Sequence, residues 1–329
     1  MILGRKTTIM SKNKDTDKAN ITGENDIKPP KRFVSREELD YLKNYDIANF
    51  ERPSVATDIA VFSIAGDEAC DLNYRKVPVK KLKLLMIKRA SYPYKNCWAL
   101  PGGFCQKGED ITYTAKRELF EETHIDSAYL RLSGVFGEPD RDPRGWIISH
   151  SFMALIDKDK CIPRAGSDAW EAKWFDVLLT LEDKKQEFKG DNVTTDYIYG
   201  LRLTNGDIVL SALIAEHKLY ENYHESFSYE IISEQGFAFD HAKIITHQLC
   251  RLRETAEHDA RIVFDLMPEY FTLTELQQAF EIILDKQLLT PNFRRKMSEY
   301  VIETDKINEG AGHRPPKLFK RNVKAFYYA

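Results

Sequence analysis

The pattern of apolar and polar positions divides the chain into a sheet-forming part and a helical part. Runs rich in β-branched and other apolar residues occur at 55–64 ("VATDIAVFSI"), 82–90 ("LKLLMIKRA"), 145–156 ("GWIISHSFMALI") and 171–177 ("EAKWFDV"). Their length and composition are typical of strands. Because these strands flank a helical segment without regular alternation of strand and helix, we expect an α+β sandwich with a mixed sheet.

After about Leu219 the pattern becomes helical, and we expect it to stay so as far as the C-terminal tail. Asp240 is placed to cap a helix that carries Ile245, Leu249 and Leu252 on one stripe. The first helix of a C-terminal helical domain is therefore expected to begin at Asp240.

Three further elements follow in a recognisable order. Thr272 and Glu275 form a T-x-x-E capping box at the start of an apolar helix. Thr290 is expected to be the N-cap of a short basic helix with Pro291 at its first position. The tail 301–322 has the pattern of a strand, a Gly-rich turn and a second strand. This order predicts a winged helix-turn-helix domain.

Residues 1 to about 30 are polar and contain few apolar side chains, so they cannot offset the entropy lost on ordering. We predict a disordered tail at 1–35, the sandwich domain at 36–220 and the winged-helix domain at 221–329.

The charge is distributed unevenly along the chain. The net charge is −3, but from Lys286 to the end there are ten Lys and Arg against four Asp and Glu. A basic segment favours an anionic partner, double-stranded DNA first, and the alternative is an ordinary solvated basic face.

The five cysteines form no C-x-x-C pair, so a disulfide framework or a zinc site is not indicated and a reducing cytoplasm is the expected location. No apolar run reaches the ~20 residues that span a bilayer, and the N-terminus lacks the hydrophobic segment of a signal peptide. We expect neither membrane insertion nor export.

Candidate chemistry is concentrated in "LPGGFCQKGEDITYTAKRELFEETHI", residues 100–125. On a helix, Glu118, Glu121 and Glu122 lie within an arc of about 100°. Three carboxylates on one face repel each other and oppose the helix dipole unless a cation binds them. The spacing therefore predicts a site for Mg²⁺, which prefers oxygen ligands.

Two other pairs support this arrangement. Arg117 can form a bidentate ion pair with Glu109 that fixes the loop against the helix. Gly102 and Gly103 allow the backbone to approach a metal ion or phosphate.

The segment resembles the Nudix box, G-x5-E-x7-R-E-U-x-E-E-x-G-U, over its whole length. The resemblance implies a Nudix α/β/α sandwich that cleaves nucleoside diphosphates linked to another moiety, with Mg²⁺ or Mn²⁺ as cofactor. It implies that Glu118, Glu121 and Glu122 hold the metal, with the Gly102 carbonyl as a further ligand, and that Arg117 and Glu109 belong to the catalytic set. His124 replaces the final glycine of the box, and it is a residue type that tolerates the left-handed conformation required there.

The loop "FGEPDRDPRG", residues 136–145, carries Arg141, Asp142 and Arg144 and can hold phosphates, or it can be a plain surface loop. Together with the segment that begins at Arg52, it resembles the ADP-ribose pyrophosphatase branch of the Nudix family. Joined to a winged helix, these pieces resemble, over roughly residues 40–320, the Nudix-related regulators of NAD metabolism and of sugar use. The resemblance implies that Arg52, Arg141, Asp142 and Arg144 bind ADP-ribose.

The resemblance implies hydrolysis of ADP-ribose to AMP and ribose 5-phosphate. The residues leave the general base open among Glu118, Asp142, Asp168 and Glu171. The alternative is a repressor that binds its ligand without turnover.

Arg294, Arg295 and Lys296 lie where a recognition helix reaches DNA, and the wing would carry four more cations. These are Arg314, Lys317, Lys320 and Arg321. A homodimer is the expected assembly, and the alternative to DNA binding is a winged helix used for dimerisation only.

Overall fold

The computed structural model describes residues 35–66, 80–126, 129–157, 169–307 and 316–327. The predicted disordered tail at 1–35 lies outside these residues except for Ser35. The chain divides into two compact units, Met1–Glu51 and Arg52–Ala329.

The described part of the first unit is short and exposed. Helix α1 (Arg36–Asn44) begins after Ser35, whose side chain accepts a hydrogen bond from the Glu38 amide at 3.2 Å. A single 3₁₀ turn, η1 (Ile47–Asn49), follows and is capped by Asp46. Neither helix buries a residue in this described stretch, so their N-caps are the main local stabilisation.

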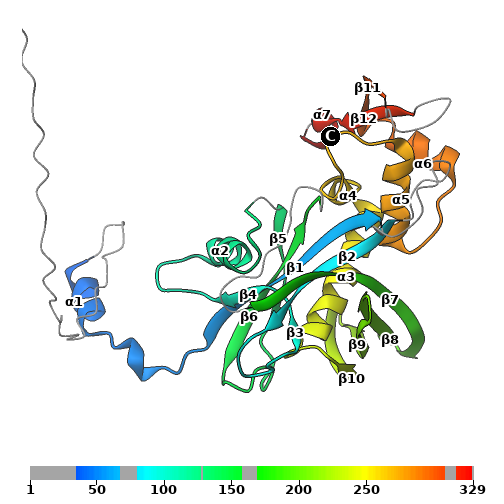
Figure 1. The fold of residues 1–329 in the computed structure, drawn as a ribbon. Coiled ribbons are helices and arrows are strands. Elements are labelled where there is room, and N and C mark those ends of the chain that lie inside the picture. Colours follow the sequence, from blue (N-terminus) through cyan, green and yellow to red (C-terminus); the bar gives the residue numbers. More distant parts are fainter. Residues whose placement is uncertain (1–34, 67–79, 127–128, 158–168, 308–315, 328–329) are drawn as a thin grey trace, which may run out of the picture. The chain divides into compact units, whose positions relative to one another are not determined.

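The second unit is built on a ten-stranded sheet (Figure 1). The strands are β1 (Ser54–Gly66), β2 (Lys80–Arg89), β3 (Trp98–Ala99), β4 (Gly102–Phe104), β5 (Tyr129–Phe136), β6 (Ile147–Leu155), β7 (Ala169–Lys189), β8 (Asn192–Asn205), β9 (Ile208–Glu221) and β10 (His224–Gln235). Their order is β10-β9-β8-β7-β2-β1-β6-β5, with β3 beside β2 and β4 beside β1. Because β1 and β6 are parallel while the other pairs are antiparallel, the predicted mixed sheet is confirmed.

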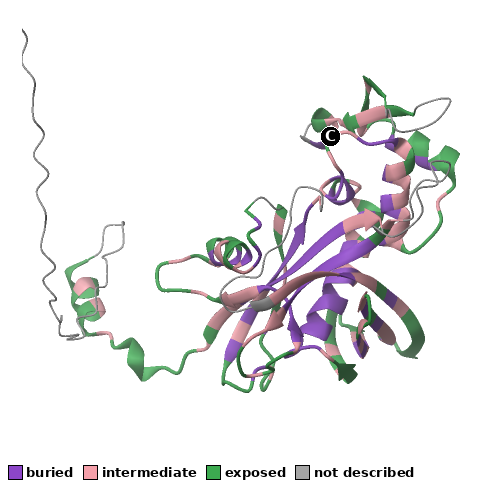
Figure 2. Ribbon diagram, in the orientation of Figure 1, coloured by how far each residue is buried: buried purple, intermediate pink, exposed green. Residues whose placement is uncertain are grey.

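Helices cover both faces of the central strands. On one face, Ile59 and Val61 of β1 share a core with Leu119 of α2 (Ile111–Thr123). On the other face, Phe62 shares a core with Ile245 of α3 (His241–His258). The predicted α/β/α sandwich is confirmed. Burial on both faces explains the continuous apolar run in β1, and the central strands are largely purple, that is buried, in Figure 2.

The expectation of helix after Leu219 is wrong at its start, because β10 occupies His224–Gln235 and pairs with β9. Tyr229 and Ile231, two residues apart, are half-buried against the core, and the rest of this edge strand is exposed, including Phe227, whose ring stacks on His247. Such a short alternating signal cannot be separated from a polar helix by sequence pattern alone. Strands β8 and β9 were also not predicted, and β7 extends beyond the predicted segment to Lys189.

The predicted helices and hairpin occur in the predicted order, and two short helices that were not predicted are also present among the remaining elements. The remaining elements are α3, α4 (Arg261–Phe264), α5 (Leu273–Leu284), α6 (Thr290–Met297), β11 (Val301–Ile307), β12 (Lys317–Arg321) and α7 (Val323–Tyr327). The capping box at Thr272 and Glu275 is confirmed in full. The prediction for Thr290 is wrong by one position, because Leu289 is the N-cap and Thr290 begins α6 without a side-chain cap.

The antiparallel pair β11–β12 supplies the predicted hairpin, and helices followed by a hairpin confirm the winged-helix architecture. Among the described helices, none is long and apolar enough to cross a membrane. The domain limits 36–220 and 221–329 stay a prediction.

Candidate functional site

The loop and helix of the box are fixed at both ends. Helix α2 begins after Asp110, whose side chain accepts a hydrogen bond from the Tyr113 amide at 2.8 Å. It ends at His124, which adopts φ 60° and ψ 24° and donates its amide to the Phe120 carbonyl. The prediction that His124 takes the left-handed conformation of the missing glycine is confirmed.

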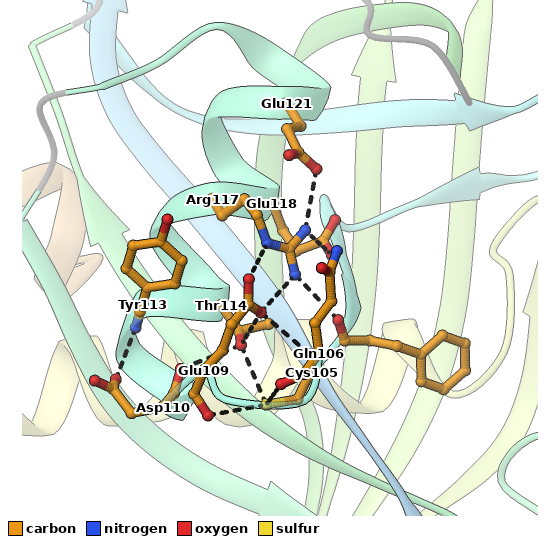
Figure 3. Close-up of polar contacts among 10 residues, drawn as sticks. Cys105, Gln106, Glu109, Asp110, Tyr113, Thr114, Arg117, Glu118 and Glu121 are labelled. Atoms are coloured by element: carbon orange, nitrogen blue, oxygen red, sulfur yellow. Dashed lines mark hydrogen bonds and ion pairs between the residues drawn. The ribbon is translucent and has the colours of Figure 1, made fainter. Parts of the chain in front are cut away.

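Arg117 is the centre of the box (Figure 3). It binds Glu109 through both arms of its guanidinium, with Nε 2.7 Å from Oε1 and Nη2 2.9 Å from Oε2. Nη2 also donates to the Phe104 carbonyl at 3.1 Å, which ties the helix to β4. The predicted ion pair that fixes the loop against the helix is therefore present. The hydrogen bonds from Arg117 lower the pKa of Glu109 to about 2.

The same guanidinium also binds two of the three box glutamates. Its Nη1 lies 2.7 Å from Glu118 Oε1 and 3.0 Å from Glu121 Oε2. The repulsion expected from sequence is thus reduced in part within the protein, since one positive charge faces several carboxylates. Burial raises the pKa of Glu118 and outweighs the opposing effect of Arg117.

The two glycines leave space that side chains would fill. A Cβ atom on Gly103 would lie 2.5 Å from the Glu118 carboxylate, and one on Gly102 would lie 2.0 Å from the Thr57 carbonyl oxygen. The Gly102 amide donates to Glu122 Oε2 at 2.7 Å. The backbone of the two glycines therefore lies close to Glu118 and Glu122, and its approach to a metal ion or phosphate stays a prediction.

These groups open on a cavity of about 390 Å³. Six predicted site residues line it, namely Gly102, Glu118, Glu122, Arg141, Asp142 and Arg144. Four others do not line it, namely Glu109, Arg117, Glu121 and the exposed Arg52. Of the remaining candidates for the general base, Asp168 lies outside the described residues, and Glu171 is half-buried and lies 3.2 Å from Lys173.

The donor chemistry of the cavity suits a divalent cation, although the ligand set is not preassembled. Glu118 and Glu122 both face the cavity, and Mg²⁺ is commonly held by one or two carboxylates together with water and phosphate oxygens. Within the described residues, no three His, Cys, Asp or Glu side chains converge on one metal position. Glu121 is directed towards Arg117 and is half exposed.

The predicted phosphate loop is held by ion pairs of its own. Arg144 donates two hydrogen bonds to the Asp142 carboxylate, from Nε at 2.9 Å and from Nη2 at 2.7 Å. The same guanidinium lies 5.0 Å from the Phe104 ring and 5.1 Å from the Phe239 ring. Burial raises the pKa of Asp142, but Arg144 lowers it further, so the carboxyl titrates below its usual range. Asp142 is therefore a poor proton acceptor near neutral pH.

Arg141 is buried and binds two carboxylates that the sequence analysis did not select. It forms a fork with Asp240 at 2.9 and 2.7 Å and lies 3.3 Å from Asp58. His241 also faces Asp58, with Nε2 3.4 Å from its Oδ1. A lone acid inside the apolar run of β1 was the available signal for Asp58, whereas no local pattern could pair it with Asp240, which lies 182 positions later.

The predicted DNA-binding residues of α6 lie on its outer face. Arg294, Arg295 and Lys296 are exposed, whereas Phe293 and Met297 are buried against the core. None of the three cations forms an ion pair with any described residue. On the hairpin, Lys317 pairs with Glu303 and Arg321 with Asp265, while Arg314 lies outside the described residues.

Comparison with known proteins identifies both halves of this arrangement. The NUDIX domain family matches residues 77–196, and the family described as NrtR DNA-binding winged helix domain matches residues 263–320. The chain is 30% identical, over 85% of its length and 86% of the relative, to the ADPR responsive transcriptional repressor NtrR of Acinetobacter baylyi.

Two further similarities bear on the separate parts. The ADP-ribose pyrophosphatase of Methanocaldococcus jannaschii is 42% identical over 39% of this chain and 70% of its own length. The crystal structure of Shewanella oneidensis NrtR complexed with a 27mer DNA shares the fold over 82% of this chain and 94% of that chain, with a TM-score of 0.53 and 21% identity.

A Nudix box that opens on an acidic and basic cavity, followed by a winged helix with an exposed basic helix, agrees with these matches along the chain. The chain therefore belongs to the NrtR family, in which a Nudix domain is joined to an NrtR winged-helix domain.

Proposed function

We propose that this chain is a DNA-binding transcriptional repressor whose cavity binds ADP-ribose. The observation that carries the proposal is the similarity along 85% of the chain to a repressor described as ADP-ribose responsive. The exposed cations of α6 supply the charge that DNA phosphates attract.

The cavity has the chemistry that such a ligand needs. Arg141 and Arg144 can attract a diphosphate, and the Phe104 and Phe239 rings help to hold the Arg144 guanidinium at the cavity. A volume of about 390 Å³ falls within the ordinary range of small-ligand pockets.

The test is fluorescence anisotropy with labelled DNA from the promoter of this chain's own gene. We expect tight binding that changes at least about fivefold when ADP-ribose is added, since coupling between two ligands is commonly of this size or larger. Calorimetric binding of ADP-ribose without any effect on DNA affinity would contradict the repressor proposal.

A second function, hydrolysis of ADP-ribose to AMP and ribose 5-phosphate, is favoured by the intact box. Glu118 and Glu122 face the cavity, and the relative from M. jannaschii is described as an ADP-ribose pyrophosphatase. When bound, Mg²⁺ or Mn²⁺ would supply neutralisation of the diphosphate and activation of water, with Glu118 and Glu122 holding the ion.

The chain's own residues divide the remaining work. Arg117 and Glu109 orient the helix that carries the glutamates, and Gly103 leaves room for the Glu118 carboxylate. Because Glu118 is proposed to hold the ion, we do not also propose its carboxylate as the general base.

The test of hydrolysis is AMP release from ADP-ribose in Mg²⁺. We expect Glu118→Gln and Glu122→Gln each to lower kcat by at least about 100-fold, because the charge stabilisation that a bound ion supplies is worth several kcal/mol. Absent turnover in the wild type, with a raised melting temperature in ADP-ribose, would identify the alternative, a repressor that binds its ligand without cleaving it.

The remaining assignments are proposals of the same kind. A homodimer in the cytoplasm is proposed, with Arg52, Arg141, Asp142 and Arg144 at the ligand. The proposed DNA contacts are Arg294, Arg295, Lys296, Arg314 and Lys317.

A further inference from the structure

Helix α3 begins at the wall of the ligand cavity and ends among the helices of the winged-helix part. His241, its first residue, lines the cavity, and Phe239 precedes it there. Towards the other end, Leu252 shares a core with Ala279 and Phe280 of α5. One continuous helix of 18 residues therefore contacts both functional parts.

The N-cap of α3 is not capped by its own side chain. Asp240 stands at the N-cap position, but its carboxylate makes no cap hydrogen bond. It instead accepts both arms of the Arg141 guanidinium, and both side chains are almost completely buried, at 6% and 5% exposure. The ion pair has displaced the hydrogen bonds that an Asp at this position ordinarily makes.

Arg141 is held from a second side by Asp58. The Asp58 carboxylate accepts from Ser149 Oγ at 2.5 Å and lies 3.3 Å from Arg141 Nη2. His241 accepts the Leu100 amide on Nδ1 at 2.8 Å, so in its neutral form its proton is on Nε2, which faces Asp58. Asp58 therefore keeps Ser149 and His241 as partners when Arg141 moves.

Other groups lie near Asp240 that can contact its carboxylate when Arg141 moves away. Lys243 Nζ lies 3.9 Å from its Oδ2. The Ala242 amide, at the second position of α3, is a usual donor to an N-cap carboxylate, whereas the amides at the first and third positions already donate to backbone carbonyls. A buried carboxylate left without partners would be costly, but here the helix terminus can replace the guanidinium. Arginine pairs with phosphate through the same fork geometry as with carboxylate, so an entering diphosphate competes directly with Asp240.

We propose that Arg141 is the residue through which ligand occupancy reaches α3. The diphosphate of a nucleoside diphosphate ligand draws the guanidinium away from Asp240, and the released carboxylate turns to cap the first turn of α3. The inference rests on the proposed ADP-ribose binding and adds to it the residue pair that links the cavity to the helix shared with the winged-helix part.

The test is calorimetric titration of the full-length chain with ADP-ribose. If the diphosphate and Asp240 compete for Arg141, removing the Asp240 charge should strengthen ligand binding rather than weaken it. Asp240→Asn removes the competitor for Arg141, so we expect ADP-ribose to bind at least about fivefold tighter, the factor that loss of a charge-assisted hydrogen bond implies. Arg141→Gln should bind at least about fivefold weaker on the same grounds. Glu234→Gln is the matched control, because Glu234 acts on Asp240 and His241 only through its charge.

A variant Asp240→Asn that melts like the wild type but binds no tighter than Glu234→Gln would overturn the proposal, since Asp240 would then be only a structural anchor. Hydrogen exchange adds a second readout in the wild type, where ADP-ribose should slow exchange of the Ala242 amide in the first turn of α3. Unchanged exchange at saturating ligand would overturn the cap switch. Failure of the wild type to bind ADP-ribose at all would be a different result, because it would refute the proposed function.

Discussion

Arg117 binds several of the acidic residues around it and reduces the repulsion between them. Glu118 and Glu121 share one face of α2 as expected, but both accept hydrogen bonds from this guanidinium. One guanidinium therefore offsets only part of the negative charge of the box, because it also makes two bonds to Glu109 and carries a single positive charge. Of the three box glutamates, Glu122 has no hydrogen bond to Arg117 and accepts the Gly102 amide.

The absence of a side chain at Gly103 is predicted to be needed for the position of the Glu118 carboxylate. In Gly103→Ala the new methyl group would stand 2.5 Å from the Glu118 carboxylate, which is the flexible end of its side chain and would move aside. We expect an unchanged fold but a loss of about 10- to 100-fold in Mn²⁺ affinity, typical when a metal ligand loses its positioning. Isothermal titration with Mn²⁺, together with AMP release, measures the effect.

The control for this variant is Gly137→Ala, whose methyl group would meet Ile148 at an ordinary 3.4 Å. The losses from Gly103→Ala and Glu118→Gln should not add when the two are combined, because both act on one carboxylate. Additive losses would show that Gly103 acts elsewhere.

Among the elements, α5 and α6 begin in different ways although both have Thr near the start. Thr272 and Glu275 exchange hydrogen bonds in a complete capping box, whereas Thr290 is already the first residue of α6 and caps nothing. The Pro291 signal marks the start of α6 correctly to within one residue, which is the usual uncertainty of helix ends.

Because only Thr272 caps its helix, we expect Thr→Ala at the two positions to change the free energy of unfolding by different amounts. Thr272→Ala should lower the free energy of unfolding by about 1 kcal/mol, because a buried helix start loses its cap. Thr290→Ala is the matched control and should change stability by less than about 0.5 kcal/mol. Scanning calorimetry of both variants measures the difference, and equal losses would refute the assignment of the caps.

For the whole molecule, the functional parts are joined through a shared core rather than by a linker alone. Arg253 of α3 donates to the carbonyl of Leu179 on β7 and to that of Ile283 on α5. Lys80 of β2 pairs with Glu275 of α5 at 3.2 Å. Sheet and winged-helix part are thus in direct contact, and the proposed coupling between ligand and DNA would pass through this contact.

At this scale we predict the salt dependence of DNA binding. Arg294→Ala should reduce the slope of log K against log [salt] by about 1, as for the loss of one phosphate contact. Lys185→Ala removes the same charge from an exposed site on β7 and should leave the slope unchanged. Anisotropy titrations over a range of NaCl concentrations measure both, and identical slopes for the two variants would contradict a DNA contact at Arg294.

Features that depend on neighbours in the chain were predictable from the sequence. The box spacing, the Glu109–Arg117 pair, the left-handed His124 and the Thr272 capping box each involve residues within about two helical turns or one loop. The apolar runs of β1, β2 and β6 predicted central strands because burial on both faces makes them continuous. Winged-helix topology followed from the order of helix signals and hairpin.

The tertiary structure decided what depends on residues far apart in sequence. Edge strand β10 buries too little to leave a clear periodic signal, so its pairing with β9 defines it. Arg141 meets Asp58 and Asp240 only because the sheet and α3 fold together, 83 and 99 positions away along the chain. Sequence therefore determined which residue types were available for acid, base and phosphate chemistry, and folding decided which of them bind one another, because ion pairing depends on distance in space.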